Sequence, residues 1–282
     1  DLVCTSVGVG NVEALAQPLA GALARRRAPL DVWAVENGDC AGSLAARVQA
    51  EATGAGLRLP PLGFAGAVAK VAIAHGSWHG VVRPEFVGDD ARELWVDERG
   101  LRLGVPELEG VRGTPDYLAR LREKLYVFNA GHAIGAYLGW LRGHGTIAEA
   151  VEDPHLRPMV TGCLLESRRA LLGAYPQLGD DLHGPVAEAL ARYADTELAD
   201  PIARVARDPI RKLGPGDRLL GPVRLIRAGS GRVPAYFALG VAAALLYQDP
   251  HDRQAQTLRR RLRREGVHAV LAELSGLLPD DS

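Results

Sequence analysis

The N-terminal third of the chain alternates short apolar runs with segments of helical spacing. Residues 1–7 (DLVCTSV) and 29–36 (PLDVWAVE) have the length and composition of buried strands, and residues 11–27 between them have the spacing of a helix. A strand, helix, strand order builds a parallel sheet. The pattern therefore predicts an α/β fold, which continues with a helix over 39–52 and a half-exposed strand over 93–98.

The pattern beyond residue 116 is almost entirely helical. Residues 64–74 are apolar and fit either a strand or a helix, and the Gly- and Pro-containing residues 100–115 are predicted to be a linker. Helices are predicted over 117–128, 146–151, 156–174, 183–197, 218–228, 234–247 and 252–277, the last with a break near Gly266. We therefore expect an α/β domain over 1–112 and an all-α, multi-helix domain over 113–282.

Composition places the chain among globular proteins and limits its partners. The 282 residues are 47% hydrophobic and 24% charged, with a formal net charge of −1. No apolar run has the ~18 residues of a membrane span, and the charge balance does not call for nucleic acid. Three cysteines, Cys4, Cys40 and Cys163, have no close spacing, which favours reduced thiols and a cytoplasmic location.

Lysine and asparagine are scarce, which draws attention to the few that occur. The lysines are Lys70, Lys124 and Lys212, and the asparagines are Asn11, Asn37 and Asn129. Codon bias toward Arg is the simplest explanation. Where only positive charge is needed, Arg can serve, whereas a desolvated Lys can lose its proton and act as a general base.

The sharpest cluster of polar residues is Lys124, Asn129 and His132 in EKLYVFNAGHAIGAYLG. On an ideal helix, Asn129 and His132 lie about 140° and about 80° around the axis from Lys124, so all three can border one cleft. A neutral Lys can take a hydroxyl proton, an amide can stabilise the developing oxyanion, and an imidazole can orient the substrate. These groups suit alcohol oxidation without a metal. The alternative is an ordinary polar helix face.

These residues resemble the active-site signature of the polyol-specific long-chain dehydrogenases and reductases. NAGHAIGAYLG is most similar to the branch that acts on mannitol 1-phosphate, and the likeness continues through residues 145–153 (GTIAEAVED) and 192–219. DLVCTSVG and AVENG resemble later strands of that family's nucleotide-binding domain. The resemblance implies the C-terminal portion of a Rossmann-like domain followed by the helical substrate domain.

The resemblance also implies roles for individual residues. Lys124 would be the general base, Asn129 and Asn37 the oxyanion donors, and His132 the residue that positions the substrate. Asn37 followed by Gly38 is equally an ordinary turn. The cationic segment 204–212 (RVARDPIRK) would hold a substrate phosphate through Arg207, Arg211 and Lys212, or else form a charged surface helix end.

The cofactor expected from the resemblance is NAD, with NADP left open. Gly8, Asn11 and Glu36 are predicted on the cofactor side, because Gly8 and Asn11 lie where a strand gives way to a helix. The chain has no Gly-x-Gly-x-x-Gly fingerprint, so we expect an N-terminal segment to precede it. No metal site is expected, since the spacing of His75 and His79 (HGSWH) is interrupted by helix-disfavouring residues.

The expected activity is therefore interconversion of D-mannitol 1-phosphate and D-fructose 6-phosphate by a monomer or weak dimer, with a small-molecule sugar phosphate as its partner. Two alternatives stay open. One is a dehydrogenase or reductase of non-phosphorylated polyols or hexuronates. The other is a non-catalytic fragment that binds a sugar phosphate.

Overall fold

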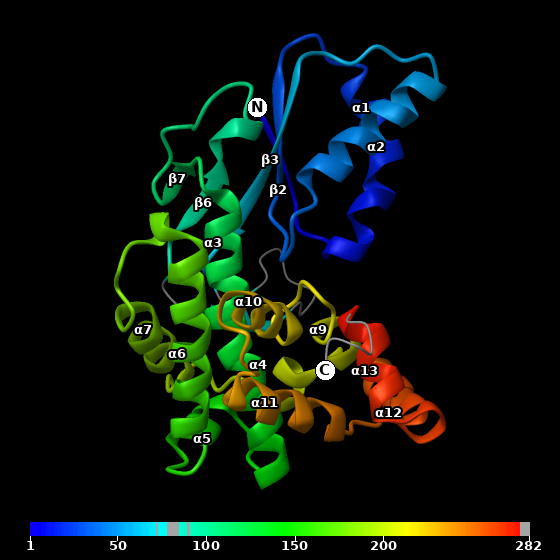
Figure 1. The fold of residues 1–282 in the computed structure, drawn as a ribbon. Coiled ribbons are helices and arrows are strands. Elements are labelled where there is room, and N and C mark those ends of the chain that lie inside the picture. The colour runs from blue at the N-terminus through cyan, green and yellow to red at the C-terminus, as the bar shows by residue number, and fades with distance from the viewer. Residues whose placement is uncertain (72, 78–84, 89–90, 277–282) are drawn as a thin grey trace. The chain divides into compact units, whose positions relative to one another are not determined.

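A computed structural model describes residues 1–71, 73–77, 85–88 and 91–276 (Figure 1). The chain divides into two compact units. The N-terminal unit comprises residues 1–71 and 90–121, and the helical unit comprises residues 72–89 and 122–282. No helix of the described residues is both long enough and apolar enough to cross a membrane.

A five-stranded sheet forms the centre of the N-terminal unit, which confirms the predicted α/β class. Its order is β1-β2-β3-β6-β7. The pairs β1–β2, β2–β3 and β6–β7 are parallel, whereas β3 and β6 are antiparallel. The strands are Leu2–Thr5 (β1), Leu30–Ala34 (β2), Leu62–Ala69 (β3), Leu94–Asp97 (β6) and Val111–Thr114 (β7). The ambiguous apolar run after residue 63 thus belongs mainly to a strand.

Helices α1 (Ala16–Leu23) and α2 (Ala41–Gly54) pack against each other in this unit, and their apolar faces join one core with β2. The helix predicted over 11–27 is split, since residues Val9–Leu15 form a 3₁₀ helix. Pro18 explains the split. It has no N–H to donate to the carbonyl of Ala14 and is tolerated in the first turn of α1.

The linker predicted over 100–115 is wrong, because this segment belongs to the sheet unit. The amides of Arg102 and Leu103 donate to the buried carboxylate of Asp31 at 2.8 and 3.1 Å. Residues 111–114 then form β7, parallel to β6. The short strand VRGT has too little apolar alternation to be recognised from sequence. The boundary between the two units falls between Leu121 and Arg122, within α3 (Tyr117–Glu123).

The helical unit is built around α4 (Asn129–Arg142), which packs against α5, α6, α8 and α11. The predicted helices are present, although the one predicted over 183–197 ends at Tyr193, and Gly266 (φ 81°) separates the last two as expected. Residues 133–142 of α4 and the short helices α8 and α9 lie outside the helix ranges predicted from sequence. The helices are α5 (Ile147–Glu152), α6 (Arg157–Ala174), α7 (Gly184–Tyr193), α8 (Ile202–Ala206), α9 (Pro209–Lys212), α10 (Leu220–Ser230), α11 (Ala235–Leu246), α12 (Arg253–Glu265) and α13 (Val267–Ser275). Strands β4 (Ile73–Ser77) and β5 (Glu85–Gly88) form an antiparallel pair.

Candidate active site

A π-helical turn at Lys124–Phe128 joins α3 to α4. The amide of Asn129 donates to the carbonyl of Lys124, five residues back. On an ideal α-helix five residues span about 1.4 turns, whereas this bond closes the same residues into a single turn. The angle of about 140° predicted for an ideal helix therefore does not apply between Lys124 and Asn129, because the π turn reduces it.

Buried polar contacts hold both ends of this turn. Arg168, 2% exposed, donates to the carboxylate of Glu123 at 2.6 Å, immediately before Lys124. At the other end, the Tyr193 hydroxyl donates to the carbonyl of Phe128. A Cβ added to Gly131 would lie 2.5 Å from Cδ2 of Leu164, so a glycine is needed for α4 to approach α6. The π turn is thus anchored by partners on α6 and α7.

Lys124 is half-buried within the helical unit. Burial lowers the pKa of Lys124 to about 8, with further lowering by the positive charges of Arg218 and Arg192. A lysine with this pKa is partly neutral near physiological pH and can accept a proton. The environment of Lys124 is therefore suited to a general base.

His132 is fixed by a carboxylate on one side and an aromatic ring on another. Its Nε2 atom lies 3.2 Å from Oδ2 of Asp200, and its ring stacks on Tyr193 with centroids 5.2 Å apart and planes 4° apart. Burial lowers the pKa of His132, although Asp200 partly offsets this effect. A neutral ring that donates from Nε2 to a carboxylate has Nδ1 as an acceptor.

Asp200 is itself held on several sides. Arg204 donates from Nε to Oδ1 of Asp200 at 2.6 Å. The Asp200 carbonyl accepts from the amide of Ile147 at 3.0 Å, and the preceding residue, Ala199, has a left-handed φ of 42°. A left-handed non-glycine residue is strained, and it persists where the surrounding structure holds it in place. Sequence reasoning missed Asp200, whose only local signal is an Asp-Pro pair before a helix.

The predicted phosphate-binding residues occupy different environments. Arg207 and Arg211 are exposed, and Arg211 forms ion pairs with Asp217 at 3.2 Å and Asp208 at 3.8 Å. Lys212 is only 2% exposed, and its Nζ donates to the carbonyl of Arg207. Burial lowers the pKa of Lys212 to about 6, with a further contribution from Arg218. Lys212 therefore supports the Arg207 backbone from within.

Arg218 is a further cation that sequence reasoning missed. Its side chain is 12% exposed, and its Nε lies 2.8 Å from Oδ1 of Asp217. Two hydrogen bonds connect the segment that carries Arg218 to its surroundings. Leu219 N donates to Lys212 O at 3.2 Å, and the Tyr126 hydroxyl donates to Gly216 O at 3.4 Å. The positive charge of Arg218 lowers the pKa of both Lys124 and Lys212, so it connects the two groups electrostatically.

The predicted cofactor-side residues lie at the carboxyl ends of β1 and β2. Gly8 has a φ of 87°, which glycine adopts without strain. Glu36 is buried, and its two carboxylate oxygens accept from the amides of Val7 and Gly8 at 2.8 Å each. Asn11 is exposed, and its side-chain amide donates to Val7 O at 2.9 Å. Glu36 thus organises the turn.

Asn37 follows Glu36 directly and has an exposed side chain. The adjacent Gly38 lies close to Val9, because an added Cβ there would be 2.8 Å from Cγ2 of Val9. The turns after β1 and β2 are therefore packed together. Their position at the carboxyl edge of parallel strands is where α/β proteins bind ligands.

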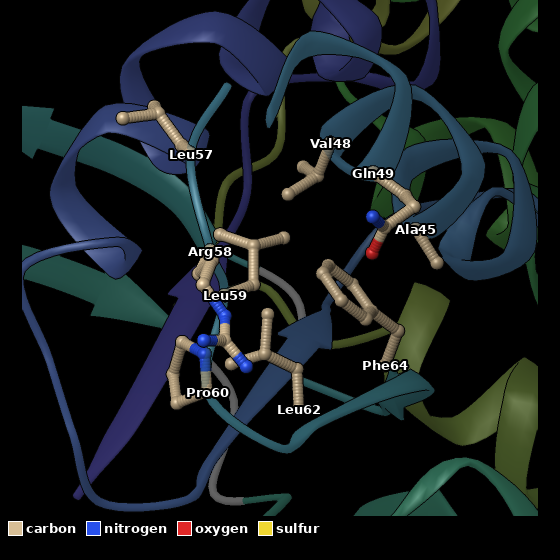
Figure 2. A pocket seen from close by; sticks show the side chains of 9 residues that line it. All are labelled: Ala45, Val48, Gln49, Leu57, Arg58, Leu59, Pro60, Leu62 and Phe64. Atoms are coloured by element: carbon tan, nitrogen blue, oxygen red, sulfur yellow. The ribbon is translucent and has the colours of Figure 1, made fainter. Parts of the chain in front are cut away.

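A hollow in the N-terminal unit is separate from these residues (Figure 2). It has a volume of about 550 Å³ and lies between α2, the following loop and β3. None of the predicted site residues lines it. Its lining consists of Ala45, Val48, Gln49, Leu57, Arg58, Leu59, Pro60, Leu62 and Phe64.

The described residues contain no cluster of three or more potential metal ligands. His79 lies outside the described residues, and residues 73–77, which include His75, form a strand, so helical ligand spacing does not apply there. Cys163 is buried, and burial raises its pKa well above the usual value. A protonated thiol of this kind is a poor nucleophile.

Two solved structures share the fold of this chain. Mannitol 2-dehydrogenase from Pseudomonas fluorescens, solved in ternary complex with NAD and D-mannitol, superposes with a TM-score of 0.72 at 17% identity, over 99% of this chain and 67% of that chain. A substrate-free D-sorbitol dehydrogenase has a TM-score of 0.64 at 19% identity, over 95% of this chain and 59% of that chain.

Sequence comparison establishes the relationship. Residues 117–280 match the mannitol dehydrogenase C-terminal domain. Mannitol-1-phosphate 5-dehydrogenase from Bacillus licheniformis is 32% identical over 293 residues, which cover 100% of this chain and 76% of that protein. The Bacillus pumilus enzyme of the same name is 36% identical over 189 residues, which cover 67% of this chain but only 49% of that enzyme. The chain belongs to the mannitol dehydrogenase family.

Proposed function

We propose that this protein is an oxidoreductase that interconverts D-mannitol 1-phosphate and D-fructose 6-phosphate with a nicotinamide cofactor. The observation that carries the proposal is Lys124, whose pKa is lowered to about 8, placed one π turn before Asn129. The relatives named mannitol-1-phosphate 5-dehydrogenase support the choice of reaction.

Lys124 would act as the general base. In its neutral form it accepts the proton of the C5 hydroxyl of mannitol 1-phosphate. The oxygen of that hydroxyl becomes the C2 carbonyl oxygen of fructose 6-phosphate. The side-chain amide of Asn129 donates to this oxygen as negative charge develops. Asn37 is proposed as the second donor on the family resemblance. In the reverse direction, protonated Lys124 returns the proton.

His132 would orient the substrate by accepting a hydrogen bond from one of its hydroxyl groups at Nδ1. Asp200 supports this role, because it binds Nε2 and leaves Nδ1 unprotonated. The stack on Tyr193 limits rotation of the ring. His132 therefore acts as an acceptor of fixed direction, and Lys124 handles the reacting proton.

The N-terminal unit has features that fit a nicotinamide cofactor. The turns after β1 and β2 offer Gly8, which has no side chain, and the exposed residues Asn11 and Asn37 at the carboxyl edge of the sheet. Gly8, Asn11 and Glu36 would hold or shape this site. The bound cofactor supplies the hydride acceptor. NAD is proposed, since the P. fluorescens relative was solved with it, and NADP stays the alternative.

Arg207 and Arg211 would contact the substrate phosphate, with Lys212 holding the Arg207 backbone beneath them. Exposed guanidinium groups can bind phosphate through two hydrogen bonds each. Arg211 already pairs with two carboxylates, so phosphate binding would have to exchange these contacts. This arrangement favours a phosphorylated substrate over a free polyol or hexuronate. Arg211→Ala should raise KM for fructose 6-phosphate and leave turnover of fructose unchanged.

Steady-state reduction of fructose 6-phosphate tests the proposal. Lys124→Ala should lower kcat by about 10² to 10⁴, the usual contribution of a general base. Lys70→Ala is the matched control and should retain activity. Circular dichroism checks that both variants fold. Near-wild-type turnover by folded Lys124→Ala would refute the mechanism. Calorimetric binding of fructose 6-phosphate without NADH binding would favour the non-catalytic alternative.

A further inference from the structure

Helix α11 exposes an entirely apolar face. No charged residue occurs between Pro234 and Tyr247. The helix packs on α4 and α6, and its buried residues are Phe237, Gly240, Val241, Ala243 and Ala244. The outer side is also apolar, and its exposed residues are Ala235, Tyr236, Ala238, Leu239, Ala242 and Leu246. We call this outer side the α11 face.

Such a surface is unusual for a helix at the edge of a globular domain. Surface helices normally present polar residues to water, and a helix that is apolar all round is normally covered. Here Leu239 is 47% exposed, Leu246 is 57% exposed and the preceding Val233 is 68% exposed. A contiguous apolar patch of a few hundred Å² commonly marks an interaction site.

We propose that the α11 face binds the same face of a second copy of this chain, with the two helices antiparallel. The charges that flank the helix favour this direction. Arg232 precedes the N-terminus of α11 and is exposed, whereas Asp249 follows its C-terminus. A two-fold axis between Gly240 and Val241 places Arg232 opposite Asp249 of the partner subunit. Parallel packing would instead bring like charges together at each end.

The register that pairs these charges also pairs large side chains with small ones. Leu239 lies opposite Ala242 of the partner subunit, and Leu246 lies opposite Ala235 of the partner subunit. Residues 235, 239, 242 and 246 follow the 4-3-4 spacing of a coiled-coil seam. Because the contact is isologous, each pairing occurs twice across the axis. The face is therefore complementary to itself in shape and charge.

The size of the α11 face limits the strength of this association. One helix face buries less than the roughly 800 Å² per partner of a standard stable interface. The expected assembly is a weak dimer in rapid exchange with monomer. This proposal is independent of the proposed enzymatic function, because it uses none of the residues of the candidate active site.

Sedimentation equilibrium over a broad range of protein concentration tests the dimer. The wild-type chain should show reversible monomer–dimer association, and Leu239→Asp should weaken it by about tenfold or more, because a charge is buried at the centre of the contact. The matched control is Leu103→Asp, at a leucine that is 54% exposed in the N-terminal unit. It should dimerise like the wild type. The proposal is overturned if the wild-type chain stays monomeric at every concentration. It is also overturned if the Leu239→Asp variant dimerises as strongly as the wild type.

Charge reversal tests the antiparallel register. Arg232→Asp should weaken association, because it opposes Asp249 of the partner subunit. Combining it with Asp249→Arg should restore association, since the pair is regenerated with opposite polarity. Asp249 also accepts from Tyr247 and His251, so circular dichroism and unfolding confirm that the double variant folds. A folded double variant that associates no better than Arg232→Asp refutes the register.

Discussion

The Nε2 atom of His132 lies 3.2 Å from Oδ2 of Asp200, a residue far away in the sequence that is only 7% exposed. Arg204 donates to both oxygens of the same carboxylate. This chain of contacts determines which ring nitrogen of His132 donates and which accepts. In the proposed enzyme, the ability of His132 to orient substrate therefore depends on Asp200.

Replacing Asp200 with Asn should impair substrate positioning while Lys124 stays intact. The amide can accept only weakly and can present its NH₂ group to Nε2, which favours the wrong tautomer of His132. We expect kcat/KM to fall about 10- to 100-fold, the scale of supporting interactions around a functional histidine. The rise of kcat/KM for oxidation with increasing pH, assigned to Lys124, should not move. Exposed Asp180→Asn is the control, and an unchanged KM and kcat in Asp200→Asn would contradict this role.

The pH dependence of oxidation should report the ionisation of Lys124. Because the neutral amine is the base, kcat/KM for mannitol 1-phosphate should rise with pH and level off above about 8. Arg218→Gln removes a positive charge that disfavours the ammonium form, so the pKa of Lys124 should increase and the profile should shift to higher pH. Exposed Arg259→Gln serves as the control. A profile of Arg218→Gln that coincides with wild type would disprove the coupling.

Stability should also depend on pH through Lys212. The folded pKa is lowered to about 6, below the ordinary value of 10.5, so the unfolded chain binds more protons between these two values. The free energy of unfolding attributable to this group therefore increases as pH rises from about 6 toward 10. Urea unfolding of wild type and Lys212→Met should show the wild type gaining stability relative to the variant across this window. A difference that stays constant with pH would exclude a neutral buried Lys212.

Gly131→Ala should destabilise the helical unit. Its Cβ would lie 2.5 Å from Cδ2 of Leu164, and overpacking of this kind costs about 1–3 kcal/mol. Gly229→Ala in α10 is a matched control, because its added Cβ meets no atom within 4 Å. The control should be neutral or stabilising by up to about 1 kcal/mol. Chemical denaturation measures both, and equal stability of the two variants would show that α4 and α6 can readily move apart.

Local patterns in the sequence determined much of the architecture. Apolar runs and helical spacing predicted the parallel α/β part, the helix-rich C-terminal part and the break at Gly266, because each depends on residues close together in the chain. The cluster Lys124, Asn129 and His132 was also visible, since all three lie within nine residues of one helical segment.

Tertiary structure decided the features that depend on distant partners. The π turn at Lys124 is held by Arg168 and Tyr193. Helical periodicity in the sequence does not reveal that the amide of Asn129 bonds five residues back instead of four. Asp200 and Arg218 acquire their relation to His132 and Lys124 only through packing. Burial likewise lowers the pKa of Lys212. The charged residues around it along the chain gave no sign that this side chain would be buried. Composition and spacing identified the residue types available for chemistry, while folding set their solvation, charge neighbours and direction.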